Sequence, residues 1–141
     1  ALIIHVDADI AREIEINCYC EPPNMQDTVN NLKDLLNYKL DKSKDDSRII
    51  FCIPSDNTEA WILCAPHLHN PPTQYLEGIQ KPDYLIASKP LSLLKMKDGK
   101  PKKTAVKYKN DLIPKLLQEW DNVRKICSQA ETFSNDILSL K

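Results

Sequence analysis

The stretch LIIHVDADIA, residues 2–11, joins a strand-like run to two carboxylates separated by one alanine. Four of the residues 2–6 are aliphatic, which predicts a buried strand. Asp7 and Asp9 follow where this strand should end. Carboxylates resist desolvation unless a positive charge compensates them. Two explanations therefore stand side by side: both acids face water beyond the strand, or they converge on a cation.

A strand–helix–strand pattern continues from this stretch. Residues 24–40 repeat apolar side chains at helical spacing, which predicts a helix. The run RIIFCIP, residues 48–54, is apolar without interruption, as is typical of a parallel strand covered on both faces. We therefore expect an α/β fold with a βαβ core and parallel strands. Two parallel strands alone have no independent stability, so we expect further strands from residues upstream of Ala1 or from another protein subunit.

Three further segments extend this outline. The alternation in REIEINCYCEPP, residues 12–23, predicts an extended edge segment that stops at the two prolines. Residues 56–65, DNTEAWILCA, have helical spacing, and Trp61 is expected in the core. Residues 70–104 are rich in proline and lysine, which predicts loops with short helical pieces.

Two amphipathic helices are expected towards the end of the chain. The first should bury a face made of Leu112, Ile113, Leu116, Leu117 and Trp120. The second should begin at the capping-box sequence SQAE, residues 128–131, and bury Phe133, Ile137 and Leu138. We divide the chain into an α/β core, residues 1–66, and a lysine-rich and helical part of the same domain, residues 67–141.

The composition is typical of a soluble globular protein of one domain, with 42% hydrophobic and 28% charged residues in 141 positions. No apolar run approaches the roughly 20 residues that a membrane span needs, so we expect no membrane anchor. The five cysteines are odd in number and widely spread, which favours reduced thiols in the cytoplasm over a disulfide framework. An alternative for the cysteines is a zinc site. It would be made of Cys18, Cys20, Cys64, His67 and His69, whose spacing along the chain is unusual for zinc ligands.

The net charge of −1 hides an asymmetry between the two halves of the chain. Residues 1–60 hold 6 Lys and Arg against 12 Asp and Glu, whereas residues 61–141 hold 13 against 8. Seven lysines lie within residues 95–109, opposed only by Asp98. Such halves suit a protein that binds a metal ion with one part and a polyanion with the other. They equally suit two halves that attract each other, and a lysine run is often only a solvated loop.

Three carboxylates are candidate metal ligands. In an extended chain, Asp7 and Asp9 point to the same side, at the strand end where ligands of parallel sheets gather. Hard oxygen ligands favour Mg²⁺ or Mn²⁺ over Zn²⁺. Glu59 follows the second strand and is placed to reach the same cleft. The alternative for Glu59 is structural, because Asp56 and Glu59 also fit an N-cap and N3 pair.

These motifs together resemble a known family. The strand ending in HVDAD, the later IPSDNTEAWIL and the C-terminal VKYKNDLIPKLLQEWDNVRKICSQAETFSNDI resemble the bacterial Toprim-like proteins of the RloB type and their relatives. The resemblance covers residues 2–138, and D-x-D and E-A-W-I-L are its diagnostic parts. It implies a Toprim fold in which Asp7, Asp9 and Glu59 bind Mg²⁺ for phosphodiester chemistry. The family's first glutamate, on an upstream strand, has no match here: either it precedes Ala1 or the chain lacks it.

Two functions are consistent with this resemblance. The first is a Mg²⁺- or Mn²⁺-dependent nuclease, a phosphodiester-cleaving effector of bacterial anti-phage defence with DNA or RNA as its partner. Asp7 and Asp9 would bind the ion, and Glu59 would be a further ligand or orient water. Lys103 or Lys107 would hold a phosphate. The second is a non-catalytic Toprim-like interaction or sensing module within a larger defence complex, which the unmatched glutamate favours.

Overall fold

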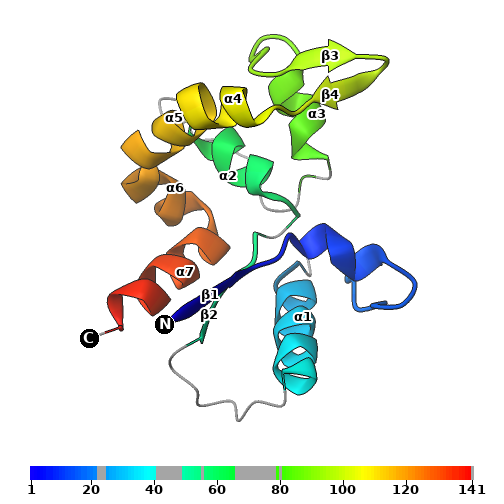
Figure 1. Ribbon diagram of the computed structural model, residues 1–141, viewed down its shortest axis with the longest axis vertical. Helices are drawn as coiled ribbons and strands as arrows, with labels where there is room; N and C mark the ends of the chain where they lie inside the picture. Colours follow the sequence, from blue (N-terminus) through cyan, green and yellow to red (C-terminus); the bar gives the residue numbers. More distant parts are fainter. Residues whose placement is uncertain (22–24, 41–48, 55, 66–78, 80, 141) are drawn as a thin grey trace.

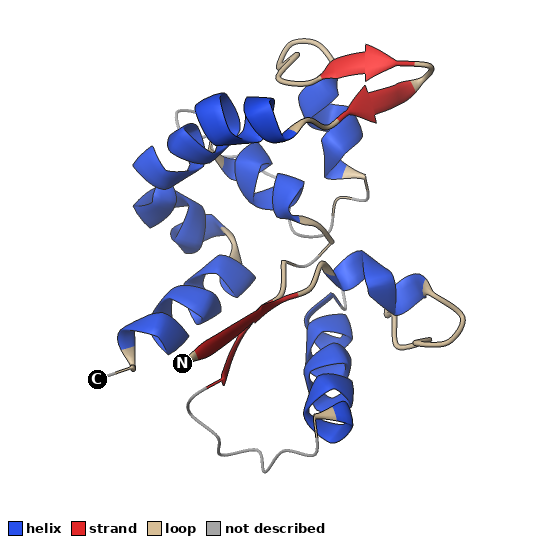
Figure 2. Cartoon of the chain, viewed as in Figure 1, coloured by secondary structure: helices blue, strands red, loops and turns tan. Residues whose placement is uncertain are grey.

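A computed structural model describes residues 1–21, 25–40, 49–54, 56–65, 79 and 81–140. Figure 1 shows two strands crossing the lower half, helices on either side of them, and a separate hairpin at the upper edge. Most of the described chain is helical (Figure 2). The elements are β1 (Leu2–His5), the 3-10 helix η1 (Ala8–Arg12), α1 (Met25–Lys39), β2 (Ile49–Cys52), α2 (Thr58–Cys64), α3 (Pro82–Ala87), β3 (Lys95–Lys97), β4 (Lys100–Lys102), α4 (Ala105–Lys107), the π-helix η3 (Tyr108–Leu112), α5 (Ile113–Gln118), α6 (Trp120–Ile126) and α7 (Ser128–Leu138).

The expected βαβ unit is present. Strands β1 and β2 pair in parallel, with Leu2 opposite Ile49 and His5 opposite Cys52. The long helix α1 lies between them in the chain, close to its predicted bounds. The fold is thus a mixed α/β arrangement with a small parallel sheet and many helices.

Strand β2 is covered on both faces, as its uninterrupted apolar sequence predicts. On one side, Val29 and Leu32 of α1 form a small buried core with Ala8 and Ile53. On the other side, α7 contacts β2, and Cys52 belongs to a larger core built mainly from helices (Figure 1). This larger core joins residues from both parts of the chain, including Trp61 as predicted.

The prediction that the first strand is buried is wrong, because β1 carries much exposed apolar surface. Leu2 is 54% and Ile3 is 51% exposed, whereas Ile50 of β2 is buried. Within the described residues β1 pairs with β2 alone. The expectation that another strand or subunit completes this sheet therefore stays a prediction, and exposed aliphatic side chains on β1 are consistent with it.

The prediction of an extended edge segment over residues 12–23 is wrong for its described part. Residues 8–12 form η1, and the chain then turns back, with the amide of Cys18 donating to the Ala11 carbonyl at 3.1 Å. Asn17 has a positive φ of 43°, which ends the alternation. Ile14 is consequently 95% exposed, while Ile16 packs against the small core. The local turn therefore prevents the extended conformation that the alternation of apolar residues predicts.

The β3–β4 hairpin is the element that the loop prediction for residues 70–104 missed. Met96 pairs with Pro101, and the two-residue turn between the strands is Asp98-Gly99. Both turn residues have positive φ, 51° and 74°, as a tight hairpin turn of this kind requires. The Asp-Gly dipeptide was the available signal, and glycine adopts such angles without steric cost. Residues 70–78 and 80 lie outside the described part.

The C-terminal helices form where the spacing predicts them, but some buried positions are wrong. Leu112 and Leu116 are buried, whereas Leu117 is 65% exposed. Helix α7 starts at Ser128, yet its N-cap residue is Cys127 and not the serine of the expected capping box. Ile137 and Leu138, expected in the core, are 38% and 65% exposed. These aliphatic side chains border a hollow that the predicted faces did not include.

Among the described residues, the cysteines of the alternative zinc site are not gathered in one place. Cys64 is buried in the larger core, with its Sγ 2.6 Å from that of Cys127, whereas Cys18 packs against the smaller core. His67 and His69 lie outside the described residues. Among the helices that the structure describes, none has the length and apolarity to cross a membrane.

Candidate functional site

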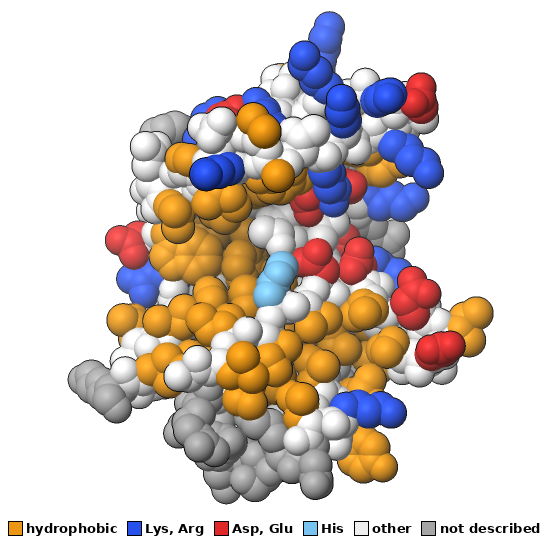
Figure 3. All heavy atoms as spheres, in the orientation of Figure 1, with side chains coloured by type: hydrophobic (Ala, Val, Ile, Leu, Met, Phe, Trp, Pro, Cys, Tyr) orange, Lys and Arg blue, Asp and Glu red, His pale blue; other side chains and the backbone are white. Residues whose placement is uncertain are grey.

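The carboxyl ends of β1 and β2 are held side by side beyond the strands themselves. The amide of Ala8 donates to the Pro54 carbonyl at 3.1 Å, and the amide of Asp9 donates to the Asp56 carbonyl at 2.9 Å. The parallel pairing therefore brings Asp7 and Asp9 next to Asp56. Figure 3 shows acidic side chains gathered beside the pale blue histidine in the middle of the face.

Asp7 and Asp9 share a location for a different reason from the one expected. Asp7 is the N-cap residue of η1, and Asp9 lies in the first turn of that helix, so the segment is not a continuous strand. Both side chains nevertheless line one hollow of about 450 Å³, together with His5 and Glu13. The two-residue spacing thus predicted the shared location, although a helical turn produces it.

The Asp7 carboxylate is tied to two neighbours. The Thr58 hydroxyl at the start of α2 donates to Asp7 Oδ1 at 3.2 Å. His5 Nε2 lies 3.4 Å from the same oxygen and 3.3 Å from the Thr58 hydroxyl. These polar contacts orient Asp7, but its side chain remains 37% exposed and accessible to a ligand.

Asp9 is the carboxylate whose ionisation the site disfavours. Desolvation by neighbouring groups raises its pKa above the ordinary value, and the charges of Asp7 and Asp56 raise it further. Arg12 and Lys103 act in the opposite direction without cancelling the shift. At Asp9, desolvation and like charge therefore outweigh the neighbouring cations.

Asp56 has a partner of its own. Its buried carboxylate forms an ion pair with Arg12, with Arg12 Nη2 2.6 Å from Asp56 Oδ1. The N-cap residue of α2 is Asn57, so the expected capping role of Asp56 is wrong. Nothing in the sequence pattern indicated Arg12, because its pairing depends on how η1 folds back on the start of α2.

Glu59 is buried, at 4% exposure, and faces two donors. Lys103 Nζ lies 2.9 Å from Glu59 Oε1, and the Tyr108 hydroxyl donates a short hydrogen bond to the same oxygen. Lys103 also approaches Asp83 Oδ2 at 3.5 Å. Glu59 is thus neither the N3 residue of a capping box nor a free carboxylate, and its partners come from the segment after the hairpin.

The cluster of Glu59, Lys103 and Tyr108 shifts the pKa values of the lysine and the tyrosine. Desolvation raises the pKa of the Tyr108 phenol, and the bond to Glu59 raises it further, so the phenol stays protonated. Burial lowers the pKa of Lys103, but Glu59 outweighs this effect and the net pKa is raised. Lys103 is therefore a cation and Tyr108 a neutral donor at any physiological pH.

The other candidate lysine lies in a different place. Lys107 forms a short ion pair with Asp111, and Lys115 Nζ lies 2.8 Å from Asp111 Oδ1. These hydrogen bonds lower the pKa of Asp111. The structure thus brings Lys103, but not Lys107, to Glu59.

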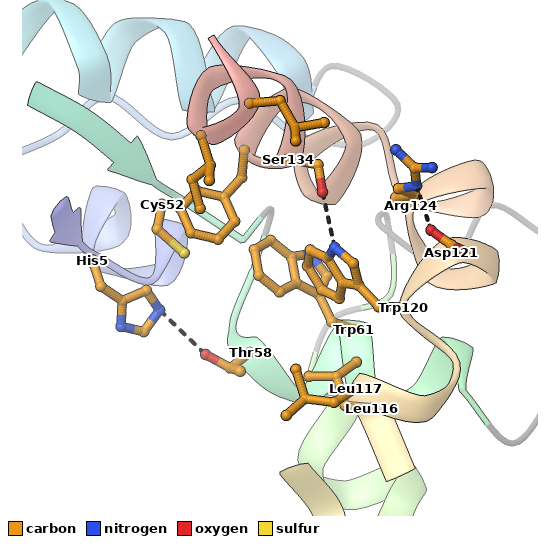
Figure 4. A pocket seen from close by; sticks show the side chains of 13 residues that line it. His5, Cys52, Thr58, Trp61, Leu116, Leu117, Trp120, Asp121, Arg124 and Ser134 are labelled. Atoms are coloured by element: carbon orange, nitrogen blue, oxygen red, sulfur yellow. Dashed lines mark hydrogen bonds and ion pairs between the residues drawn. The ribbon is translucent and has the colours of Figure 1, made fainter. Parts of the chain in front are cut away.

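A large apolar hollow adjoins the acidic one. It has a volume of about 740 Å³ and lies between the ends of β1 and β2, helix α2 and helices α5 to α7 (Figure 4). The spacing of apolar residues predicts Trp61, Trp120 and Phe133 in the core, but it does not indicate that they also line an open hollow. His5 lines both hollows, so the two lie on either side of one side chain.

Within the described residues, no three side chains of His, Cys, Asp and Glu stand close enough to form a ready-made metal-binding group. Comparison with known proteins finds no matching family model, no matching curated protein and no matching solved structure. The resemblance to Toprim-like proteins stays a prediction from the D-x-D and E-A-W-I-L motifs of the sequence.

Proposed function

We propose that the protein is a divalent-cation-dependent enzyme that cleaves phosphodiesters of nucleic acid at the carboxyl ends of β1 and β2. The main support is the meeting of Asp7, Asp9 and Asp56 there, where desolvation and like charge raise the Asp9 pKa. A bound cation would relieve this repulsion. The resemblance to Toprim-like proteins points to the same two acids of D-x-D, to Mg²⁺ or Mn²⁺, and to a role in anti-phage defence.

The donor set suits such a cation. Asp7 and Asp9 offer hard carboxylate oxygens that line one solvent-accessible hollow. Mg²⁺ keeps several waters and needs only one or two carboxylates, with substrate phosphate supplying further oxygens. A two-carboxylate site is therefore compatible with the lack of a three-residue group among the described residues.

Each nearby residue has a defined part in this proposal. A bound cation supplies a Lewis acid that stabilises charge on a phosphoryl oxygen. Asp7 and Asp9 hold the cation, and Lys103 binds a phosphate oxygen. Glu59 acts as a positioning residue, because it accepts hydrogen bonds from both Lys103 and Tyr108 and so aligns two donors.

The β3–β4 hairpin is the proposed contact for the nucleic-acid backbone. Lys95 lies opposite Lys102, and Lys97 lies opposite Lys100. All four side chains are exposed, and like charges directly opposite each other destabilise a strand pair. Phosphates bound along the hairpin would relieve this repulsion and release counterions.

Titration calorimetry with Mg²⁺ and Mn²⁺ tests the cation site. The double variant Asp7→Asn, Asp9→Asn should lose cation binding and cation-dependent cleavage, while its free energy of unfolding stays within about 0.5 kcal/mol of the parent or rises. Glu131→Gln, which removes an exposed charge from α7, is the control and should bind as the parent does. Cation binding that survives in the double variant would refute the site.

A non-catalytic interaction module is the second candidate, and one observation favours it. Glu59 is already compensated by Lys103 and Tyr108, which leaves the strand end without a third free acid from α2. The exposed Leu2 and Ile3 of β1 are suited to a contact with another subunit. This candidate predicts binding of nucleic acid or protein with no turnover in Mg²⁺, Mn²⁺ or EDTA.

A further inference from the structure

The apolar hollow beside the acids has the features of a ligand pocket. Its volume of about 740 Å³ lies within the range of small-molecule sites, and its lining is predominantly apolar. Burial raises the pKa of the Cys52 thiol to about 11, so this side chain at the pocket is neutral. Two pairs of polar groups at its margin are already engaged: Trp120 Nε1 donates to Ser134 Oγ at 2.8 Å, and Arg124 pairs with Asp121 at 3.1 Å.

Three aromatic rings form the centre of the pocket wall. The indoles of Trp61 and Trp120 meet edge to face with centroids 5.5 Å apart, and Trp61 stacks on Phe133 at 6.2 Å. Figure 4 shows the two indoles between His5 on one side and the Asp121–Arg124 pair on the other. They come from α2, α6 and α7, so tertiary packing fixes their orientation. Fixed aromatic surface beside open space suits a planar ring.

Exposed aliphatic side chains surround these rings. Leu117 and Leu138 are each 65% exposed, and both line the pocket. Exposed side chains that gather at one hollow differ from the scattered exposed leucines that any protein carries. An apolar ligand would gain free energy by covering them.

The position of His5 between the two hollows indicates which kind of ring-containing ligand suits the aromatic pocket. His5 lines both hollows, and its Nε2 is 3.4 Å from Asp7, one of the proposed cation ligands. A ligand in the aromatic pocket is therefore adjacent to whatever binds at the strand end. A nucleotide has this form, because a planar base is attached through a sugar to a phosphate.

We infer that the pocket is a base-binding subsite for single-stranded nucleic acid, an inference that rests on the proposed phosphodiester site. In a duplex the bases are stacked and paired, and only an unstacked base can enter such a pocket. Stacking on aromatic side chains tolerates every base, and two pairs of polar groups at this margin are already engaged. The subsite therefore selects single strands without selecting a sequence.

Intrinsic fluorescence offers a direct test, because both tryptophans of the chain line the pocket. The probes are an oligothymidylate and a duplex of equal length, titrated in EDTA so that binding is measured without cleavage. The single strand should quench the tryptophan emission and bind more tightly than the duplex. Trp120→Ala should weaken its binding by about tenfold or more, and Trp120→Phe, which keeps a stacking face, should restore most of the affinity.

Two controls separate local from global effects. Leu85→Ala shortens an exposed leucine of α3 outside the pocket and should bind as the parent does. Leu117→Ser changes an exposed rim residue, so it tests the pocket even if Trp120→Ala does not fold. It should weaken oligothymidylate binding more than Leu85→Ala does.

The outcomes distinguish this inference from the cation site. Loss of single-strand affinity in Trp120→Ala and Leu117→Ser supports the subsite, even if the protein shows no turnover. Cleavage with unchanged emission and unchanged affinity in both variants would overturn the subsite and leave the cation site standing. Quenching by an apolar dye but not by oligothymidylate would also overturn it, in favour of a purely hydrophobic docking surface.

Discussion

Two carboxylate sites at neighbouring positions treat negative charge in opposite ways. Around Asp7 and Asp9, like charges meet and the pKa of Asp9 is raised, with its first cause in desolvation. Around Glu59, a lysine and a phenol supply two donors to one buried carboxylate. The first site therefore favours the binding of a positive charge, whereas the carboxylate of the second site already has a cation and a hydrogen-bond donor as partners. A cation is therefore expected at the first site, and the second is expected to organise donors.

Beyond the loss of cleavage expected for the strand-end acids themselves, the largest effect should come from the second site. Glu59→Gln removes the charge that holds Lys103, and catalysis should fall by about 10²-fold because the phosphate-binding donor loses its alignment. The free energy of unfolding should fall by about 1–2 kcal/mol, since the amide oxygen can still accept a hydrogen bond. Cation affinity should not change. Turnover, urea unfolding and calorimetry on one preparation measure all three.

Asp83→Asn is the matched control for this variant. Asp83 is the more distant partner of Lys103, at 3.5 Å, so its neutralisation should have a much smaller effect on turnover. If Glu59→Gln instead abolishes cation binding, Glu59 is a metal ligand, and the two sites would have to be treated as one.

The next effect concerns the hairpin. The sequence predicts Lys103 or Lys107 as a phosphate contact. Lys107 is neutralised by Asp111, and Lys103 is held by Glu59 beside the strand end, so the proposed contacts along the hairpin are its exposed lysines. Replacing Lys97, Lys100 and Lys102 together by Gln should flatten the slope of log K against log salt by about 2–3 units.

Lys107→Gln alone is the comparison for the hairpin variant. It removes a lysine that is already neutralised by Asp111, so the salt slope should change by less than about one unit. An unchanged slope in the triple variant would eliminate the hairpin as the backbone contact. Binding would then have to arise at the strand end or at the apolar pocket.

A smaller effect is expected at the hairpin turn. Gly99 has a φ of 74°, and open space surrounds the position of an added Cβ, so the cost of Gly99→Ala is conformational rather than steric. We expect a loss of about 1 kcal/mol in the free energy of unfolding. Asp98→Asn, which tolerates a positive φ, should be nearly neutral by comparison. Equal stability of both variants would show that the turn is not formed as described.

The smallest effect is a pH dependence at the first site. Because the pKa of Asp9 is raised on folding, the folded protein retains a proton that the unfolded chain has lost in the pH range just above the ordinary aspartate value. The free energy of unfolding should therefore decrease as pH rises through that range, and Asp9→Asn should lack this component. Urea unfolding at a series of pH values measures the difference. A parent and variant with parallel pH profiles would contradict the raised pKa of Asp9.

Part of the molecule was predictable because the signals are local. Strand β1, helix α1 and strand β2 follow from runs and periods of apolar residues, and the acids after β1 are visible as a spacing. The Asp-Gly turn was also visible in the sequence and was missed. The alternation of apolar residues over 12–20 gave a wrong prediction of an extended segment. A turn at Asn17 interrupts it, and an extended segment would have needed a neighbouring strand to stabilise it.

The sequence by itself indicated the α/β character and the position of Asp7 and Asp9 directly after β1, since both depend on residues that are close together in the chain. Only the tertiary structure decided that Glu59 is compensated by Lys103 and Tyr108, and that the two tryptophans border a hollow. Those features arise where distant segments pack together. Local periodicity indicates which side chains are apolar or charged, but not which of them will meet.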